Sequence, residues 1–171
     1  MAPQLTFGKP IDFSADVPIF PPATVMLTMI TSRILWKASG RRLGWVPPPI
    51  SALAVRIAVL AVAVYLTVGV VLHQAGTELA AAGSGTLFTP VNGLATTGIY
   101  EITRNPMYSG LIFFALPTLA FVVNTAWPIL LAPLSWAYLH YVVIAAEEAL
   151  LRKTFGFKYA AYCEKVPRWL I

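Results

Sequence analysis

The sequence has few charged residues and almost no cysteine. Only 11% of its 171 residues are Asp, Glu, Lys or Arg, whereas 58% are hydrophobic and the mean hydropathy is +0.73. A chain with this balance is too apolar for a soluble domain, and it is long enough for only a few membrane spans. The one cysteine, Cys163, excludes an internal disulfide and matches no metal-ligand spacing. We therefore expect a single integral membrane domain over residues 1–171.

Motifs that are typical of several enzyme classes are also missing. The chain shows no Ser-His-Asp pattern, no zinc-ligand spacing and no phosphate-binding loop. The formal charge is +5, but the twelve Lys and Arg residues are scattered at the ends of apolar segments, as positive-inside asymmetry would produce. We therefore expect membrane lipids as partners and no nucleic acid.

Long apolar runs predict about four transmembrane helices, over 17–36, 50–73, 107–124 and 128–146. The residues before the first run lack the positive segment of a cleaved signal peptide, so we expect this run to be retained. The sequence from Asn124 to Pro128 is typical of a tight turn, which makes the last two runs an antiparallel hairpin. The expected fold class is all-α, with a C-terminal helical hairpin and an interfacial C-terminal segment.

Charge sets the expected orientation in the membrane. If the N-terminus, the segment 74–106 and the segment 147–171 share one face, that face carries seven Lys and Arg residues against four on the other. We therefore expect both segments on the cytoplasmic side, where they would cover a cofactor. The segment 74–106 is rich in small residues and nearly uncharged after its start, which is uncommon in a long loop without a function. A plain linker would have the same composition.

The stretch from Thr97 to Gly110 places an arginine at the start of the third apolar run. Asn105 and Pro106 suit the N-cap and the first helical position, so Arg104 is expected beside a helix N-terminus at the membrane boundary. An ordinary capped helix with a snorkelling arginine would show the same residues.

Two acidic residues follow the fourth apolar run, and the hairpin is expected to return them close to the arginine of the third. On a helix that continues through both acids, Tyr141 and Glu148 share one face, and His140 and Glu147 share an adjacent stripe. The alternative is an interfacial helix end in which Glu148 pairs only with Arg152 at i, i+4.

Two sequence blocks carry a resemblance to a known family. The first is G-x-Y-x-x-x-R-N-P-M-Y-x-G from Gly98 to Gly110, and the second is E-E-x-x-L-x-x-x-F-G-x-x-Y-x-x-Y-x-x-x-V-P-R-W from Glu147 to Trp169. In this order and spacing, with an apolar hairpin between them, they resemble the isoprenylcysteine carboxyl methyltransferase and phospholipid methyltransferase superfamily of integral membrane enzymes. The match covers about the C-terminal half of the chain.

The resemblance implies S-adenosylmethionine as the methyl donor, bound at the cytosolic end of the hairpin, and no metal. Arg104 would hold the methionyl carboxylate, Glu147 or Glu148 would pair with the amino group, the ribose or the sulfonium, and tyrosine rings would support the sulfonium. The implied catalytic residues are Arg104, Glu148 and Lys165, with Lys165 holding an anionic acceptor. The implied cofactor-binding residues are Gly98, Tyr100, Arg104, Asn105, Tyr108, Gly110, His140, Glu147 and Glu148.

The sequence does not decide which molecule accepts the methyl group. The family treats prenylated cysteine carboxylates, phospholipid amines, small thiols and other lipophilic groups. The short four-span plan is similar to bacterial members, which favours a lipid or small hydrophobic molecule and the bacterial inner membrane. Pro117 is expected to kink the third run and to open a lateral path for such an acceptor. The alternatives are an NADPH-dependent membrane reductase related to sterol reductases and a non-catalytic membrane scaffold.

Overall fold

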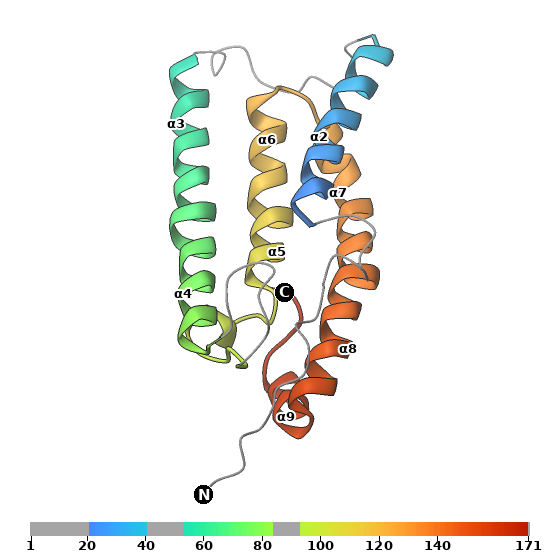
Figure 1. Cartoon of the computed structure of the whole chain (residues 1–171). Coiled ribbons are helices and arrows are strands. Elements are labelled where there is room, and N and C mark those ends of the chain that lie inside the picture. Colours follow the sequence, from blue (N-terminus) through green and yellow to red (C-terminus); the bar gives the residue numbers. More distant parts are fainter. Residues whose placement is uncertain (1–20, 41–52, 84–92, 171) are drawn as a thin grey trace, which may run out of the picture.

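The computed structural model describes residues 21–40, 53–83 and 93–170, and every regular element in these ranges is helical. Four long helical stretches lie side by side, and the short helix α9 lies at one end (Figure 1). The four stretches are α2 (Pro21–Ala38); α3 (Leu53–Val64), η2 (Tyr65–Leu72) and α4 (His73–Ala81); α5 (Pro106–Gly110), η4 (Leu111–Ala115) and α6 (Leu116–Val122); and α7 (Trp127–Tyr138), η5 (Leu139–Val143) and α8 (Ile144–Phe155). The short helices are η3 (Gly98–Glu101) and α9 (Phe157–Lys165).

Two of the continuous helices are long and apolar enough to cross a membrane. They are Ala54–Ala81, with a hydropathy of 2.4, and Trp127–Phe155, with a hydropathy of 1.7. Only 6% and 22% of their most apolar 18-residue windows are buried inside the protein, so most of this apolar surface faces outward. Contact with lipid explains such a surface, because soluble monomers rarely expose large contiguous apolar areas. The all-helical class is confirmed for the described residues, and the four-span arrangement stays a prediction.

The second helical stretch continues further than the sequence analysis expected. The segment that begins at residue 74 was predicted to be a loop, but residues 53–81 form one uninterrupted helical run. Its Gln, Glu, Leu and Ala residues favour helix, and the single internal Gly76 is too weak a breaker to stop it. Gly83, with a φ of +76°, follows the end of the helix. Residues 17–20 and 50–52 of the predicted spans lie outside the described residues.

A short turn joins the third and fourth helical stretches, which pack against each other. Asn124 has a φ of +53°, and the backbone N–H of the buried Thr125 donates to the carbonyl of Ala120 at 3.1 Å. Pro128 lies in the first turn of α7, where a proline costs no helical hydrogen bond. This reversal brings α5 and α8 to the same end of the molecule (Figure 1).

Three of the helical stretches contain a π-helical segment. One of them, η4, ends two residues before Pro117, which is the second residue of α6. A wider turn at this place accommodates the proline ring and its missing N–H within a continuous helix. A proline and a π turn each favour a bend in a helix, and the kink at Pro117 stays a prediction.

Small hydroxyl side chains hold α2 against α7. Thr24, Thr28 and Ser32 are spaced four residues apart and are all buried. Thr28 Oγ1 lies 2.7 Å from Ser135 Oγ of α7, and Thr28 and Ser32 also donate to carbonyls one turn earlier in α2. Small residues allow close approach of two helices, and hydroxyls satisfy each other where water is excluded.

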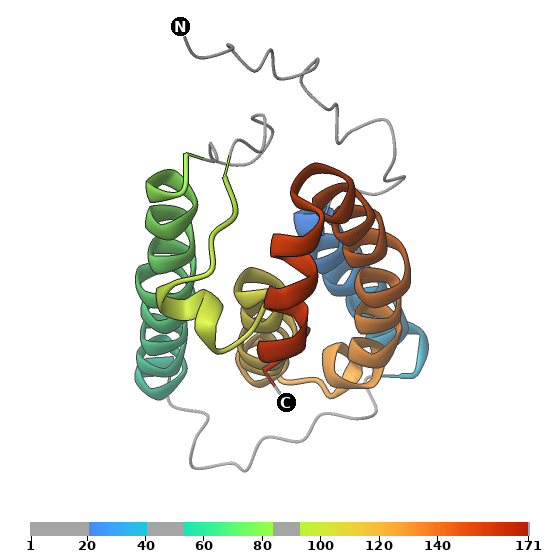
Figure 2. The same cartoon turned by 90° about the horizontal axis from the view of Figure 1, so that it is seen from below.

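The end of the molecule at α5 and α8 is covered by the segment 93–105, by α9 and by the C-terminal residues (Figure 2). The buried side chains that pack this end are Ala75, Ala95, Tyr100, Tyr159, Tyr162 and Val166. Figure 2 shows α9 and the residues after it between this segment and α8. The two blocks that carried the family resemblance therefore meet in space.

Candidate active site

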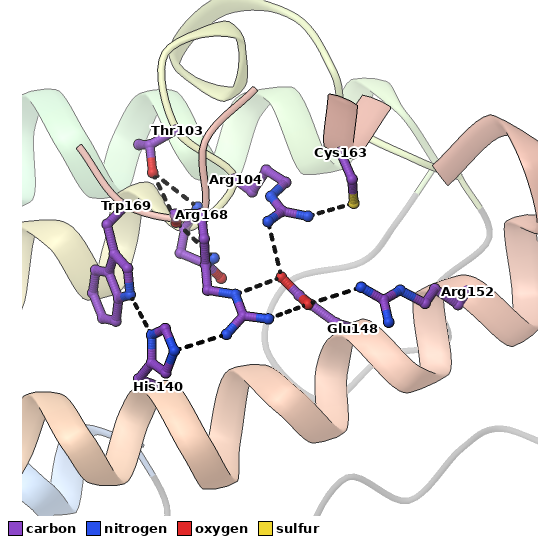
Figure 3. A network of polar contacts seen from close by, with 9 residues as sticks. Thr103, Arg104, His140, Glu148, Arg152, Cys163, Arg168 and Trp169 are labelled. Carbon is purple, nitrogen blue, oxygen red and sulfur yellow. Dashed lines mark hydrogen bonds and ion pairs between the residues drawn. The ribbon is translucent and has the colours of Figure 1, made fainter. Parts of the chain in front are cut away.

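A buried carboxylate on α8 forms the centre of a polar cluster at this end of the molecule (Figure 3). Glu148 is 4% exposed and is contacted by three guanidinium groups. Arg168 binds it bidentately, with Nη2 2.6 Å from Oε2 and Nε 2.9 Å from Oε1. Arg104 Nη2 lies 3.4 Å from Oε1, and Arg152 Nη2 lies 3.5 Å from Oε2. The predicted approach of Glu148 to Arg104 is present, and the pairing with Arg152 exists beside it rather than instead of it.

The π turn η5 decides which side chains lie on the side of Glu148. Seven-residue spacing predicted Tyr141 there, but Tyr141 is 68% exposed. A π turn holds one residue more than an α-helical turn, so positions eight apart align across it instead of seven. His140 precedes Glu148 by eight positions, and both contact Arg168. The predicted face of Tyr141 is therefore wrong, and His140 takes its place.

His140 is held by two tryptophans, one stacked on its ring and one hydrogen-bonded to its edge. Its ring stacks on Trp136 at a centroid distance of 4.7 Å and an interplanar angle of 28°, and it is also nearly parallel to Trp169 at 6.3 Å. The indole N–H of Trp169 donates to Nδ1 at 2.9 Å. Arg168 Nη1 lies 3.1 Å from Nε2. The imidazole therefore has little freedom to turn.

The C-terminal residues are fixed to the start of α5 by backbone and side-chain hydrogen bonds. The Arg104 N–H donates to the carbonyl of Pro167 at 2.9 Å, and Thr103 Oγ1 donates to the carbonyl of Arg168 at 3.1 Å. Asn105 occupies the predicted N-cap position, but its side chain makes no capping bond. Its Nδ2 instead donates to the carbonyl of Arg168 at 2.9 Å. Asn105 thus positions Arg168 rather than capping the helix.

Glu147 lies apart from the arginine cluster and pairs with a tyrosine. The hydroxyl of Tyr108 on α5 donates to Glu147 Oε1 at 2.5 Å. The two adjacent carboxylates therefore have different environments, as predicted. Nearby, Tyr162 donates its hydroxyl to the carbonyl of Tyr100 at 2.7 Å. Burial raises the pKa of both Tyr100 and Tyr162, so both remain neutral phenols.

The two predicted cofactor-binding glycines lie against protein rather than facing open space. Gly98 has a φ of +60°, and a Cβ there would meet Glu78 Oε1 at 2.5 Å. A Cβ on Gly110 would lie 3.2 Å from Val71 Cγ1. Glu78 also accepts a 2.5 Å hydrogen bond from Thr97, so it anchors the segment that leads to Tyr100. The close approach that these glycines permit is between parts of the chain.

Four of the predicted site residues lie in the polar cluster, namely Arg104, Asn105, His140 and Glu148. The other predicted residues make their contacts outside it. Lys165 is exposed at the end of α9 and makes no contact in the cluster of Figure 3. Arg168, three positions later, lies in the cluster, although it was not among the predicted site residues. Cys163 was also missed, and its Sγ contacts Arg104 Nη1. The V-P-R-W block is the sequence signal that could have identified Arg168. Pro167 prevents the helix from continuing, and the residue after it turns inward.

An apolar pocket of about 380 Å³ opens between α3 and the helix η4–α6. It is close to Pro117, where the sequence analysis expected space between helices. The residues that line it are Ala58, Val59, Val62, Ala63, Leu66, Phe114 and Thr118. Its single polar lining residue makes it suitable for hydrocarbon rather than for a charged group.

Comparison with known proteins assigns the chain to a family. The phospholipid methyltransferase family model matches residues 51–158, which is more than half of the chain, and the chain belongs to this family. Its curated relatives include protein-S-isoprenylcysteine O-methyltransferase B of Arabidopsis thaliana, 34% identical over 74 residues, which are 43% of this chain and 37% of the relative. A probable protein-S-isoprenylcysteine O-methyltransferase of Oryza sativa subsp. indica is 30% identical over 105 residues, which are 57% of this chain and 54% of the relative.

The protein-S-isoprenylcysteine O-methyltransferase of Schizosaccharomyces pombe is 36% identical over 74 residues, which are 43% of this chain and 31% of the relative. The chain thus spans between about a third and about half of the length of these relatives. No solved structure matches the chain. The family and the resemblance predicted from the two sequence blocks agree.

Proposed function

We propose that this protein is an S-adenosylmethionine-dependent methyltransferase that acts on a lipophilic acceptor at the membrane. The observation that carries the proposal is a buried carboxylate surrounded by guanidinium groups at the polar end of apolar helices. The family assignment and the names of the relatives support methyl transfer. A site on the cytoplasmic side of a bacterial inner membrane is part of the same proposal.

The polar cluster fits the charged end of the cofactor. S-adenosylmethionine carries an amino group and a sulfonium, which a carboxylate stabilises, and an α-carboxylate, which a guanidinium binds bidentately. Arg104 suits the carboxylate because its Nε is buried without a partner among the described residues. An unsatisfied buried donor of this kind costs about 1–3 kcal/mol, which an anionic oxygen would recover. Glu148 would face the cationic part, and Tyr108 would offer its ring to the sulfonium.

The acceptor would bind from the membrane side. The apolar pocket between α3 and α6 opens on a surface that is itself apolar, so a hydrocarbon tail would enter it without crossing water. The relatives are named for isoprenylcysteine, which joins such a tail to an acidic group. We include an isoprenylcysteine carboxylate-like group, a lipid and a small hydrophobic molecule in the proposed acceptor class.

Methyl transfer needs alignment and exclusion of water more than a dedicated base. The bound cofactor supplies a methyl group on a positively charged sulfur, which is open to in-line attack by an acceptor oxygen, nitrogen or sulfur. The task of this chain is to hold donor and acceptor in line and to keep water out. The hydrogen bonds from Arg104, Thr103 and Asn105 to the C-terminal residues close the cluster on one side.

Equilibrium binding of labelled S-adenosylmethionine and of NADPH to the purified protein tests the proposal. We expect binding of S-adenosylmethionine alone. NADPH binding would support a membrane reductase, and binding of neither would support a non-catalytic scaffold. Arg104→Ala should abolish S-adenosylmethionine binding in a folded protein, whereas Lys158→Ala, at an exposed lysine of the same end, should leave it unchanged. Full binding by a well-folded Arg104→Ala protein would refute the assignment of Arg104.

A further inference from the structure

His140 is contacted by two hydrogen-bond donors, although it can satisfy only one. Trp169 Nε1 lies 2.9 Å from Nδ1, and Arg168 Nη1 lies 3.1 Å from Nε2. Indole and guanidinium nitrogens only donate. A neutral imidazole has one nitrogen with a free lone pair and one that carries a proton, and an imidazolium has no free lone pair. One of the two donors therefore always lacks an acceptor in this arrangement.

The exposure of the two donors decides which of them lacks an acceptor on His140. Trp169 is 7% exposed, so without His140 its indole N–H would be a buried donor with no partner. The Arg168 side chain is 26% exposed and already has Glu148 as an acceptor for two of its nitrogens. The favoured tautomer accepts from Trp169 at Nδ1 and carries its proton on Nε2. Nε2–H and Arg168 Nη1–H are then two donors in contact with each other.

Charge and rigidity both favour an anion at this place. The cluster holds the cations Arg104, Arg152 and Arg168 against the carboxylate of Glu148, and Glu147 is occupied by Tyr108. Even with both carboxylates ionised, three positive charges face two negative ones. The imidazole cannot turn away easily, because Trp136 stacks on it and the Trp169 N–H holds its Nδ1. The Arg168 backbone is fixed by two hydrogen bonds to its carbonyl.

We infer that Arg168 Nη1 and His140 Nε2–H together bind an oxygen of an anionic group, a carboxylate or an equivalent oxyanion, that belongs to a ligand of this protein. This inference rests on the proposed function for the identity of the ligand. The oxyanion has two possible sources, the α-carboxylate of S-adenosylmethionine and an acidic group of the lipophilic acceptor. This oxyanion site differs from the one predicted at Lys165, which was expected to hold an anionic acceptor. It is also separate from the proposed contacts of Glu148 with a cationic group.

Two matched pairs of ligands test the inference and identify the source. The first pair is S-adenosylmethionine and its decarboxylated form, and the second is N-acetyl-S-farnesylcysteine and the corresponding carboxamide. Binding is measured by titration of the detergent-solubilised full chain and of the variants His140→Phe, Arg168→Gln and Lys158→Gln. His140→Phe keeps an aromatic ring stacked on Trp136 and leaves the ion pairs of Glu148 in place, and it removes the acceptor of the Trp169 N–H. Thermal unfolding shows which variants are folded.

The expected result is an acid-over-neutral preference in the parent that both site variants reduce about tenfold or more, the usual effect of losing a hydrogen bond to a charged group. Lys158→Gln should keep the full preference. If the site variants lose the preference for the acid in the cofactor pair, the oxyanion belongs to S-adenosylmethionine. If they lose it in the farnesyl pair, the oxyanion belongs to the acceptor. Loss of the preference in both pairs means that both acids use the site.

A parent protein without any such preference, or site variants that weaken the acidic and neutral ligands equally, would overturn the inference. A parent that binds neither form of the cofactor would instead refute the proposed function, and the farnesyl pair would still decide the oxyanion site.

Discussion

Replacing Glu148 by glutamine should damage both stability and cofactor binding, whereas the same change at Glu147 should do little. Glu148→Gln leaves three guanidinium groups around a neutral amide. The Arg152 side chain is 63% exposed, so its contact contributes at most about 1 kcal/mol. Arg104 and Arg168 are 12% and 26% exposed and lose a partner that is almost fully buried. Breaking a buried pair costs about 3–5 kcal/mol. Because Arg168 retains partial hydration, we expect a loss of about 3 kcal/mol in the free energy of unfolding.

The Glu147→Gln variant is the matched control for this prediction. An amide oxygen still accepts the hydrogen bond from Tyr108, so we expect a loss of about 1 kcal/mol or less. For S-adenosylmethionine, the loss of a buried carboxylate that faces the cation should weaken binding about 30-fold, which corresponds to about 2 kcal/mol. Chemical denaturation and isothermal titration in the same detergent measure the two quantities. Equal and small effects of both substitutions would mean that the acidic pair is only an interfacial helix end.

Three further predictions follow from the packing and topology. Gly98→Ala should lower the free energy of unfolding by about 1–3 kcal/mol, because alanine is strained at a positive φ and its Cβ would clash with Glu78 Oε1. A denaturation midpoint equal to that of the parent would contradict this. Thr28→Val and Ser135→Ala should each cost about 1 kcal/mol and should be non-additive in a double-mutant cycle, whereas additive losses would mean that the two hydroxyls do not interact. Cysteines introduced within 93–101 and at Lys153 should react with a membrane-impermeant thiol reagent from the same side of the membrane, and labelling from opposite sides would exclude a shared site.

The helices and their approximate limits could be read from the sequence because they depend on local features. Pro106 and Pro128 fall in the first turns of their helices, and α8 ends at Gly156, which has a φ of +51°. The same local reasoning failed at residues 74–81, where helix formers outweigh a single glycine. The approach of Glu148 to Arg104 was also predictable, since it follows from one reversal of the chain at Asn124.

The identity of the residues around that carboxylate required the tertiary structure. Seven-residue spacing gave Tyr141 as the neighbour of Glu148, but the π turn η5 adds a residue and substitutes His140. Helical periodicity assumes a uniform turn, and no local sequence signal marks where a wider turn is inserted. The Asn105 side chain departs from its predicted capping role for a related reason, because its partner, the carbonyl of Arg168, depends on the path of the chain after α9. The role predicted for Lys165 stays a prediction.

The amino-acid sequence by itself determined the all-helical class of the described residues, the apolar character and the two blocks that carry the family resemblance, since each of these is a matter of composition, spacing or a local turn. The tertiary structure decided that Arg168 binds Glu148, that Trp169 donates to His140, and that the carbonyl of residue 168 accepts bonds from Thr103 and Asn105. These contacts join residues some 20 to 65 positions apart. Their geometry depends on how α8, α9 and the start of α5 pack together, which no periodicity in the chain encodes.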